Sequence, residues 1–529
     1  MLFLLLIVAV QSDLQNEIVK FSDGQVLGSL DGGVRSFFAV PFAAPTGGEG
    51  MFAPPHARDP WDFVMDCTTW GAGCFQSHHN PDVPKNQSMD CLNVNIFAPV
   101  LAPGTAASVM VFFNGGAFME GSNQGPFGMY GGAHLALSQG VVVVSANYRL
   151  GAFGYLATNR EGVHGSFGFM DQVAALRWVQ ENIHVVGGNA SDVTVFGESA
   201  GAMSVGLLLA TGRGEGLFHK AIMESNVAGF NYKNLSEAAV YADTFCGLLN
   251  CTDCALSCLR ASPVESILDA WNTATGDVGD FILTNLRHVL DGFLDTGPTR
   301  DGVLIPLEPL AAVESGSYWG ARVPVLLGTN TNEGETFIFD GLDSPLPPFL
   351  AEAAYLGIFQ DLNITQRIQQ QPRYHYQSFN DARIPLSNVI TDYWFRCASE
   401  KFVAGAYAAG SPAWAYRFNH LYSNASIFHT FGLPVICSTA VCHASELPFV
   451  FQNVPNFTTF TDAELLLSKQ MEAAWGNFAK TGNPNGPGAP NWPPWEPSSR
   501  LTLVLNDTMQ TESTASLCGF WDSVGGYFS

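Results

Sequence analysis

The segment Val193-Thr-Val-Phe-Gly-Glu-Ser-Ala-Gly-Ala202 constrains the fold more than any other part of the 529-residue chain. Its β-branched first half predicts a strand, and its apolar second half predicts a helix that begins near Ala200. Ser199 occupies the turn between them in a Gly-x-Ser-x-Gly pattern. Gly197 and Gly201 remove side chains that would collide in so sharp a turn, so the hydroxyl should project above a sheet beside the positive end of a helix. The segment therefore predicts a nucleophilic serine in an α/β protein.

Continuous aliphatic runs elsewhere predict further buried strands, as in a sheet covered on both faces. The expected strands are 92–97, 109–113, 141–146, 323–328, 413–418 and 501–505, with an antiparallel meander over 17–44. Helices are expected over 171–182, over 465–479, over much of 349–410, and in the cysteine-rich stretch 236–295. Since repeats, low-complexity blocks and linkers are not evident, we expect a single domain with a large, mostly parallel sheet flanked by helices.

The composition of the chain restricts the classes of partner that it can bind. The chain is 47% apolar, which is ample for a large core, and its formal net charge is −24. Such a charge argues against binding to nucleic acid or to anionic membranes, which requires basic patches. It favours the solubility of a secreted protein over the alternative, attraction of cationic substrates.

The N-terminus and the cysteines predict the secretory route. Residues 1–12 are expected to be a signal peptide, because the aliphatic run is too short to span a bilayer, and the catalytic domain would then cover 13–529. A buried N-terminal strand is the alternative, and no transmembrane anchor is expected. Eleven cysteines fit an oxidising compartment. Sequons for N-glycosylation occur at Asn86, Asn189, Asn234, Asn250, Asn363, Asn424, Asn456 and Asn506.

A nucleophilic serine needs a base and an acid, which follow it in chain order in this kind of sheet. Among the late histidines, His420, His429 and His443, we favour His443, because a small disulfide loop expected between Cys437 and Cys442 would stiffen it. For the acid, Glu333 follows a strand and ranks first. Asp295 and Asp301 stay open as alternatives, and Asp301 resembles a turn residue.

An oxyanion hole is expected in the loop Asn114-Gly-Gly-Ala-Phe118, which ends a strand with small residues. Two backbone N–H groups of this loop, with that of Ala200, would converge on the developing alkoxide. The pair His78-His79 lacks carboxylates or thiolates at ligand spacing, so we expect no metal and no cofactor.

The chain resembles the type-B carboxylesterase/lipase family, which includes the cholinesterases. The motifs that carry the resemblance are Ser36-Phe-Phe-Ala-Val-Pro-Phe-Ala-Ala-Pro45, Asp90-Cys-Leu-Asn-Val-Asn95, Asn147-Tyr-Arg-Leu-Gly-Ala-Phe-Gly-Tyr155, Asp171-Gln-Val-Ala-Ala-Leu-Arg-Trp-Val-Gln-Glu-Asn182, Phe196-Gly-Glu-Ser-Ala-Gly-Ala-Met-Ser204 and Trp475-Gly-Asn-Phe-Ala-Lys-Thr-Gly-Asn-Pro484. The resemblance implies an α/β-hydrolase fold and a secreted serine hydrolase of small-molecule or lipid carboxylic esters.

The resemblance also implies roles for individual residues. The triad would be Ser199, Glu333 and His443, and the oxyanion donors would be Gly116, Ala117 and Ala200. Glu198, Ser225 and Glu446 fall at family positions that surround the triad. Disulfides would join Cys74 to Cys91, Cys246 to Cys258, and Cys397 to Cys518. Cys251 and Cys254 are extra and could pair with each other or reshuffle the set, and Cys67 is expected as a buried thiol.

Two departures from the family bear on function. Asn114 stands where the family often has His or Tyr, but the oxyanion donors are backbone groups and we expect activity to survive. The short loop from Cys74 to Cys91 lacks the tryptophan by which cholinesterases hold a cation, which disfavours choline esters. The alternative function is a catalytically silent adhesion or binding protein of the same fold, although such members usually lose a triad residue.

Overall fold

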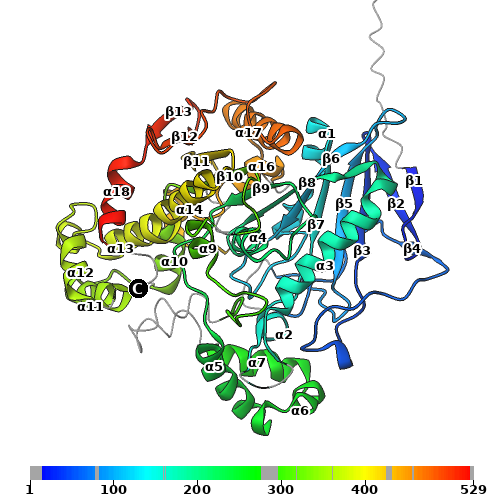
Figure 1. The fold of residues 1–529 in the computed structure, drawn as a ribbon, viewed down its shortest axis with the longest axis horizontal. Coiled ribbons are helices and arrows are strands. Elements are labelled where there is room, and N and C mark those ends of the chain that lie inside the picture. Colours follow the sequence, from blue (N-terminus) through cyan, green and yellow to red (C-terminus); the bar gives the residue numbers. More distant parts are fainter. Residues whose placement is uncertain are drawn as a thin grey trace, which may run out of the picture.

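A computed structural model describes residues 15–524 except 78–82, 159, 161–162, 276–295, 317, 343, 360, 425–431 and 455–457. One large twisted sheet runs through these residues, with helices on both sides (Figure 1). The strand order is β1-β2-β3-β5-β7-β6-β8-β9-β10-β11-β12-β13, and β4 pairs with β2. Pairing is parallel from β7 through β12 and antiparallel between the other neighbours in this order. The short strand β4 pairs with β2 in parallel. The predicted α/β architecture is confirmed.

The strands are β1 (Gln15–Lys20), β2 (Gln25–Asp31), β3 (Val34–Pro41), β4 (Val64–Asp66), β5 (Asn93–Pro99), β6 (Ala107–Phe113), β7 (Val142–Ala146), β8 (Gly188–Glu198), β9 (Lys220–Glu224), β10 (Val325–Asn330), β11 (Ala413–Phe418), β12 (Leu501–Leu505) and β13 (Gln510–Ser513). Most of the predicted strands and the meander lie within two or three residues of these bounds, but β8 begins five residues before the strand predicted from Val193. The prediction missed β4, β13 and the central strand β9. Strand β9 has charged residues at both ends, Lys220 and Glu224, so its sequence does not form a continuous apolar run. Its residues are nevertheless buried, because the strand lies in the centre of the sheet.

The helices are α1 (Ala133–Gln139), α2 (Gly151–Tyr155), α3 (Phe167–Asn182), α4 (Ala200–Thr211), α5 (Leu235–Leu248), α6 (Leu256–Ala261), α7 (Val264–Thr275), α9 (Pro309–Glu314), α10 (Glu333–Gly341), α11 (Pro348–Phe359), α12 (Leu362–Gln369), α13 (Arg383–Ile390), α14 (Cys397–Ala408), α16 (Leu447–Phe451), α17 (Asp462–Thr481) and α18 (Ala515–Val524). A π-helix, Thr391–Arg396, joins α13 to α14. The capping box between Thr461 and Glu464 starts α17 three residues before the predicted beginning.

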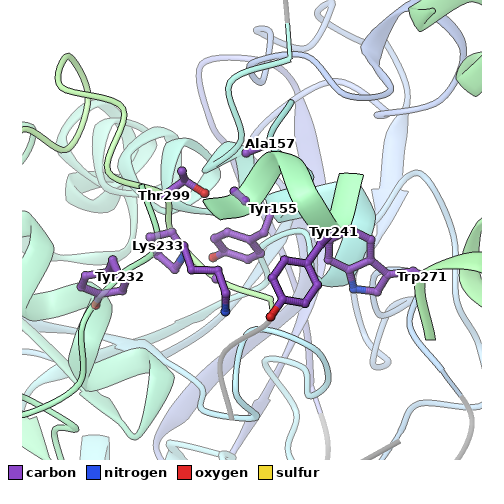
Figure 2. Close-up of a pocket in the computed structure, with 10 residues that line it drawn as sticks. Tyr155, Ala157, Tyr232, Lys233, Tyr241, Trp271 and Thr299 are labelled. Atoms are coloured by element: carbon purple, nitrogen blue, oxygen red, sulfur yellow. The ribbon is translucent and has the colours of Figure 1, made fainter. Parts of the chain in front are cut away.

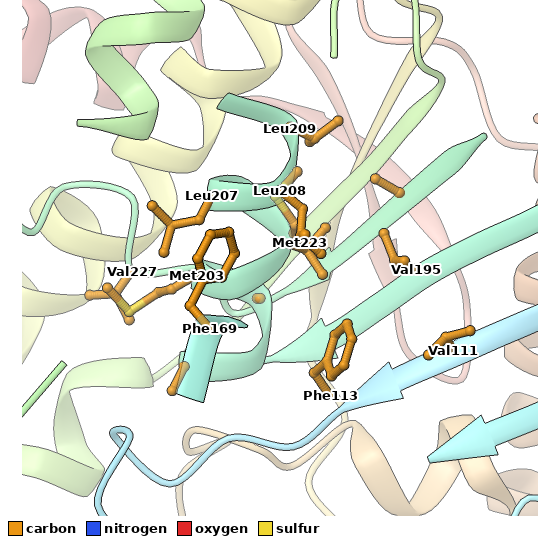
Figure 3. Close-up of a cluster of buried hydrophobic side chains, with 14 of the residues drawn as sticks. Val111, Phe113, Phe169, Val195, Met203, Leu207, Leu208, Leu209, Met223 and Val227 are labelled. Carbon is orange, nitrogen blue, oxygen red and sulfur yellow. The ribbon is translucent and has the colours of Figure 1, made fainter. Parts of the chain in front are cut away.

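The core has two halves because successive side chains of a strand point to opposite faces of the sheet. In β6, Val111 and Phe113 pack in the half covered by α3, α4 and α14, part of which is shown in Figure 3. Met110 and Phe112 pack in the half covered by α1, α16 and α17. A strand buried on both faces reads as a continuous apolar run, which is why β6 was recognisable in the sequence.

Helices α5, α6 and α7 form a separate cysteine-rich cluster below the sheet in the view of Figure 1. The structure pairs Cys246 with Cys254 and Cys251 with Cys258, so the implied pairing of Cys246 with Cys258 is wrong. Cys246 lies in the last turn of α5. The chain then turns back, so that Cys254 contacts Cys246, while Cys258 lies in the following helix, α6. Both bonds therefore close short local loops, seven and eight residues apart in sequence.

The remaining cysteines follow the sequence expectations. Disulfides join Cys74 to Cys91, Cys397 to Cys518, and Cys437 to Cys442. Cys67 is a buried free thiol. None of the helices in the described part of the chain combines the length and apolar character that a membrane crossing requires. The expected signal peptide, residues 1–12, lies outside the described residues.

Candidate active site

Ser199 stands on a sharp turn between β8 and α4. Its backbone angles, φ 55° and ψ −122°, are unfavourable for a residue with a side chain. The turn tolerates no bulk nearby, because a Cβ atom on Gly201 would lie 1.9 Å from the carbonyl oxygen of Phe113 and one on Gly197 would lie 2.5 Å from Gly201. The Ser199 N–H donates to the carbonyl of Glu224 on β9, 2.9 Å away, which fixes the turn to the sheet. The residue remains 8% exposed.

Glu333 and His443 are 110 residues apart in the sequence, and their side chains are in contact in the structure. Glu333 is the first residue of α10, just after β10, and its Oε2 lies 2.6 Å from Nδ1 of His443. The loop that carries His443 is fastened to the same helix, since the His443 N–H donates to Oγ1 of Thr336 at 3.2 Å. The imidazole also packs against the rings of Phe337 and Phe395, with centroids 4.9 and 5.3 Å away. These contacts hold the ring orientation that a general base requires.

The other ring nitrogen of His443 faces the residue before the serine. Nε2 lies 3.0 Å from Oε1 of Glu198. This contact lacks the alignment of a hydrogen bond, so Nε2 has no hydrogen-bond partner among the described residues. Burial lowers the pKa of His443, but the charges of Glu198 and Glu333 outweigh it and raise that pKa to about 9. The site therefore stabilises an imidazolium.

A buried group of polar side chains, which we name the carboxylate network, supports Glu333 from behind. Ser225 donates its hydroxyl to Oε1 of Glu333 at 2.6 Å and lies 3.3 Å from Oε1 of Glu446. Asn330 donates its backbone N–H to Glu333 at 2.6 Å and its side-chain amide to Glu446 at 2.5 Å. Burial and the nearby Glu333 raise the pKa of Glu446, and burial likewise raises that of Glu198. The structure thus brings together Glu198, Ser225 and Glu446 around the predicted triad.

The expected oxyanion loop lies directly against the serine turn. A Cβ atom on Gly115 would lie 2.5 Å from a carboxylate oxygen of Glu198 and 3.0 Å from Cβ of Ser199. Gly116 has φ 101°, and Ala117 and Phe118 also have positive φ angles. The Gly116 carbonyl accepts the N–H groups of Met119 and Glu120 and closes the turn. The loop that carries Gly116 and Ala117 therefore lies directly against the turn that carries Ser199 and Ala200.

A second buried group, which we name the amide network, holds the segment after this loop. The N–H of Asn123 donates to Oδ1 of Asn147 at 2.7 Å, and its side chain donates to Oδ1 of Asn93 at 2.9 Å. Asn95 donates to the carbonyl of Asn123 at 3.2 Å. Asn93, Asn95 and Asn147 belong to motifs quoted above, but spacing gave no sign that they would converge on Asn123.

The other candidates for the acid, the base and a metal ligand do not belong to this group of side chains. Asp301 accepts the N–H groups of Val303, Leu304 and Ile305, which makes it a turn residue, as expected. His420 lies between Glu464 and Asp507. Asp295, His429 and the pair His78-His79 lie outside the described residues. Within the described ranges, no group of three or more His, Cys, Asp or Glu side chains is arranged to hold a metal ion.

A small cavity lies behind the oxyanion loop, lined by Tyr155, Tyr232, Tyr241 and Trp271 among others (Figure 2). Tyr155 links it to the site, since its ring packs against Phe118 at a centroid distance of 5.0 Å. The cavity has room for about one water molecule. It is a gap among α2, α5, α7 and the segment 297–299, and it is too small for an ester.

Comparison with known proteins places this geometry in a family. The family model described as "Carboxylesterase family" matches residues 15–521. The para-nitrobenzyl esterase of Bacillus subtilis is 33% identical over 510 residues, which cover 94% of this chain and 96% of that protein. The human cocaine esterase is 32% identical over 521 residues, covering 92% and 87%. A solved PNB esterase structure superposes with a TM-score of 0.81 and 32% identity, covering 97% of this chain and 100% of that one.

Proposed function

Because the chain belongs to the carboxylesterase family and is a carboxylic ester hydrolase of the α/β-hydrolase fold, we propose that it works through an acyl-enzyme on Ser199. The observation that carries the proposal is the Glu333–His443 contact of 2.6 Å, which leaves Nε2 of His443 facing the serine turn.

The reaction proceeds in two halves. The Ser199 oxygen bonds to the ester carbonyl carbon while its proton passes to Nε2 of His443. The N–H groups of Gly116, Ala117 and Ala200 stabilise the oxyanion, and Glu333 stabilises the imidazolium. The carbonyl–alkoxide bond then breaks, and His443 returns the proton to the leaving alcohol. Water attacks the acyl-enzyme with His443 as base again, which releases the acid and restores Ser199.

Replacing Ser199 tests this assignment. We expect Ser199→Ala to lower the kcat for p-nitrophenyl acetate by about 10⁴-fold or more while the protein stays folded. In the parent protein, a fluorophosphonate should label the peptide that contains Ser199. Ser138→Ala is the matched control, because Ser138 lies on α1 beside Glu472, away from the turn, and its loss should leave kcat within about threefold. Labelling at another serine, or full activity of Ser199→Ala, contradicts the assignment. An absence of turnover in the folded parent would favour a silent binding protein instead.

The same proposal includes secretion and N-glycosylation. Five disulfides in the described residues and the exposed sequons at Asn86, Asn250 and Asn363 support it. Expression in a cell with a secretory pathway should deliver the protein to the medium, with a mass that falls on treatment with an N-glycosidase. Retention inside the cell with no mass change is the contrary result.

A further inference from the structure

Gln76 connects the first disulfide loop to the end of the oxyanion loop. Its side chain is 1% exposed. It donates Nε2–H to the carbonyl of Gly121 at 2.9 Å, and its Oε1 accepts the N–H of Gly121 at 2.7 Å. The amide thus satisfies both backbone groups of one residue, as a neighbouring strand would. Its Nε2 also donates to the carbonyl of Cys74 at 3.0 Å.

Gly121 connects Gln76 to the loop that carries the proposed oxyanion donors. Its φ is 108°, and a Cβ atom there would lie 2.5 Å from Nδ2 of Asn114 and 2.9 Å from the carbonyl oxygen of Gly115. The backbone of Gly121 therefore rests on the two residues that precede Gly116. Because Glu120 also donates its N–H to the Gly116 carbonyl, the segment 114–121 is a closed turn with Gly121 as its base.

The other side of Gln76 is anchored independently of the active site. The backbone N–H of Gln76 donates to Oε1 of Gln87 at 3.0 Å. Gly73 exchanges backbone hydrogen bonds with Asn86 and Ser88, and the disulfide between Cys74 and Cys91 closes the same loop. The loop that holds Gln76 is therefore closed by a disulfide, and the hydrogen bonds named here join neutral groups.

We propose that Gln76 is a positioning residue for the oxyanion hole, an inference that rests on the function proposed above. Without its amide, the N–H and carbonyl of Gly121 lose both partners, and the turn over 114–121 loses its fixed base. The N–H groups of Gly116 and Ala117 then point less accurately at the oxyanion. Since that interaction strengthens in the transition state, the loss should fall on kcat and leave KM nearly unchanged.

Gln76→Met tests the proposal, because it keeps the volume of the side chain and removes the amide. With p-nitrophenyl acetate we expect kcat to fall by about 10- to 100-fold, somewhat less than the loss of a whole oxyanion donor, with KM within about threefold. An alkyl trifluoromethyl ketone, which forms a tetrahedral oxyanion adduct on the serine, should bind more weakly by the same factor as kcat/KM falls.

Gln180→Met is the matched control. Gln180 also donates one Nε2 group to two backbone carbonyls, those of Ala190 and Leu217, but at the opposite end of β8. It should lower thermal stability while leaving kcat and ketone affinity unchanged. If Gln76→Met does not fold, Gln76→Glu replaces it, since the carboxylate still accepts from Gly121 but cannot donate when ionised.

The outcomes separate the hypotheses. Parallel loss of kcat and ketone affinity in the Gln76 variant alone supports the positioning role. A folded Gln76 variant with parent values, a change in KM alone, or equal losses in both glutamine variants overturns it. A folded parent protein that neither turns over the ester nor binds the ketone overturns the proposed function, and this inference with it.

Discussion

The two halves of the site lie side by side at the ends of the central strands, yet different chemistry holds each of them. The carboxylate network of Ser225, Asn330 and Glu446 supports Glu333 and His443. The amide network of Asn93, Asn95, Asn123 and Asn147, with Gln76, supports the oxyanion loop. Amides keep one protonation state at all pH values relevant to proteins, whereas carboxylates and imidazole exchange protons.

The difference follows from what each half must do. In the proposed mechanism the base gains and loses a proton in every turnover, so negative charge nearby is useful because it stabilises the imidazolium. The oxyanion donors must stay fixed while charge appears and disappears in front of them. An amide can fix the oxyanion loop by hydrogen bonds without adding a net charge. We therefore expect variants of the carboxylate half to change the pH profile, and variants of the amide half to leave it in place.

The largest effect should come from Glu333→Gln. The substitution keeps the shape of the acid but removes the charge that holds the tautomer of His443, and kcat should fall by about 10³- to 10⁴-fold. Rates with p-nitrophenyl acetate measure this. Glu446→Gln, two hydrogen bonds further from His443 by way of Ser225, should lose much less. Equal losses in the two variants would argue against Glu333 as the partner of the base.

A smaller effect, on stability, is expected of Asn147→Ala in the amide half. Asn147 accepts from Asn123 and donates to the carbonyls of Ala72 and Cys91, both at 3.1 Å, so its removal leaves buried groups unpaired. The free energy of unfolding should fall by about 3 kcal/mol, as measured by chemical denaturation. The pH dependence of kcat/KM should not move, and a displaced pH limb would remove the distinction between the halves. Asn485→Ala, at a more accessible amide that bonds to Trp492, should cost less.

The finest test is the pH profile of Glu198→Gln. The charge of Glu198 raises the pKa of His443, so its removal should lower that pKa. Since the base works only when neutral, the acidic limb of kcat/KM should move to lower pH from a position near 9 in the parent. Glu472→Gln is the control, because Glu472 pairs with the remote His134 at 2.7 Å. An unmoved limb in the Glu198 variant would show that Glu333 alone sets the pKa.

The sequence predicted most of the sheet because its central strands are buried on both faces and read as aliphatic runs. The strands predicted over 413–418 and 501–505 have the observed bounds. Strand β9 was missed because its ends carry Lys220 and Glu224, whose burial depends on neighbours that local sequence does not contain. The serine turn was predictable for a steric reason, since glycine is required on both sides of Ser199.

Chain order and family resemblance selected Glu333 and His443, and the structure places those two side chains in contact. The amides that hold the oxyanion loop carry no such signal. Gln76 and Asn123 are polar residues in irregular segments, and they bond to backbone groups and to side chains up to 45 residues away. The pairing of four closely spaced cysteines was wrong for a related reason, because it depends on how α5 and α6 pack.

The disulfide between Cys397 and Cys518 can close only near the end of synthesis, because its second cysteine lies late in the chain. It spans 121 residues and fastens α14 to α18, enclosing β11, the His443 loop, α17 and β12. On a growing chain, the serine turn and its oxyanion loop emerge long before their base, and the base emerges before the cysteine that closes its segment. A nascent chain therefore carries an incomplete site, and we expect ester hydrolysis to begin only after the segment through Cys518 has left the ribosome.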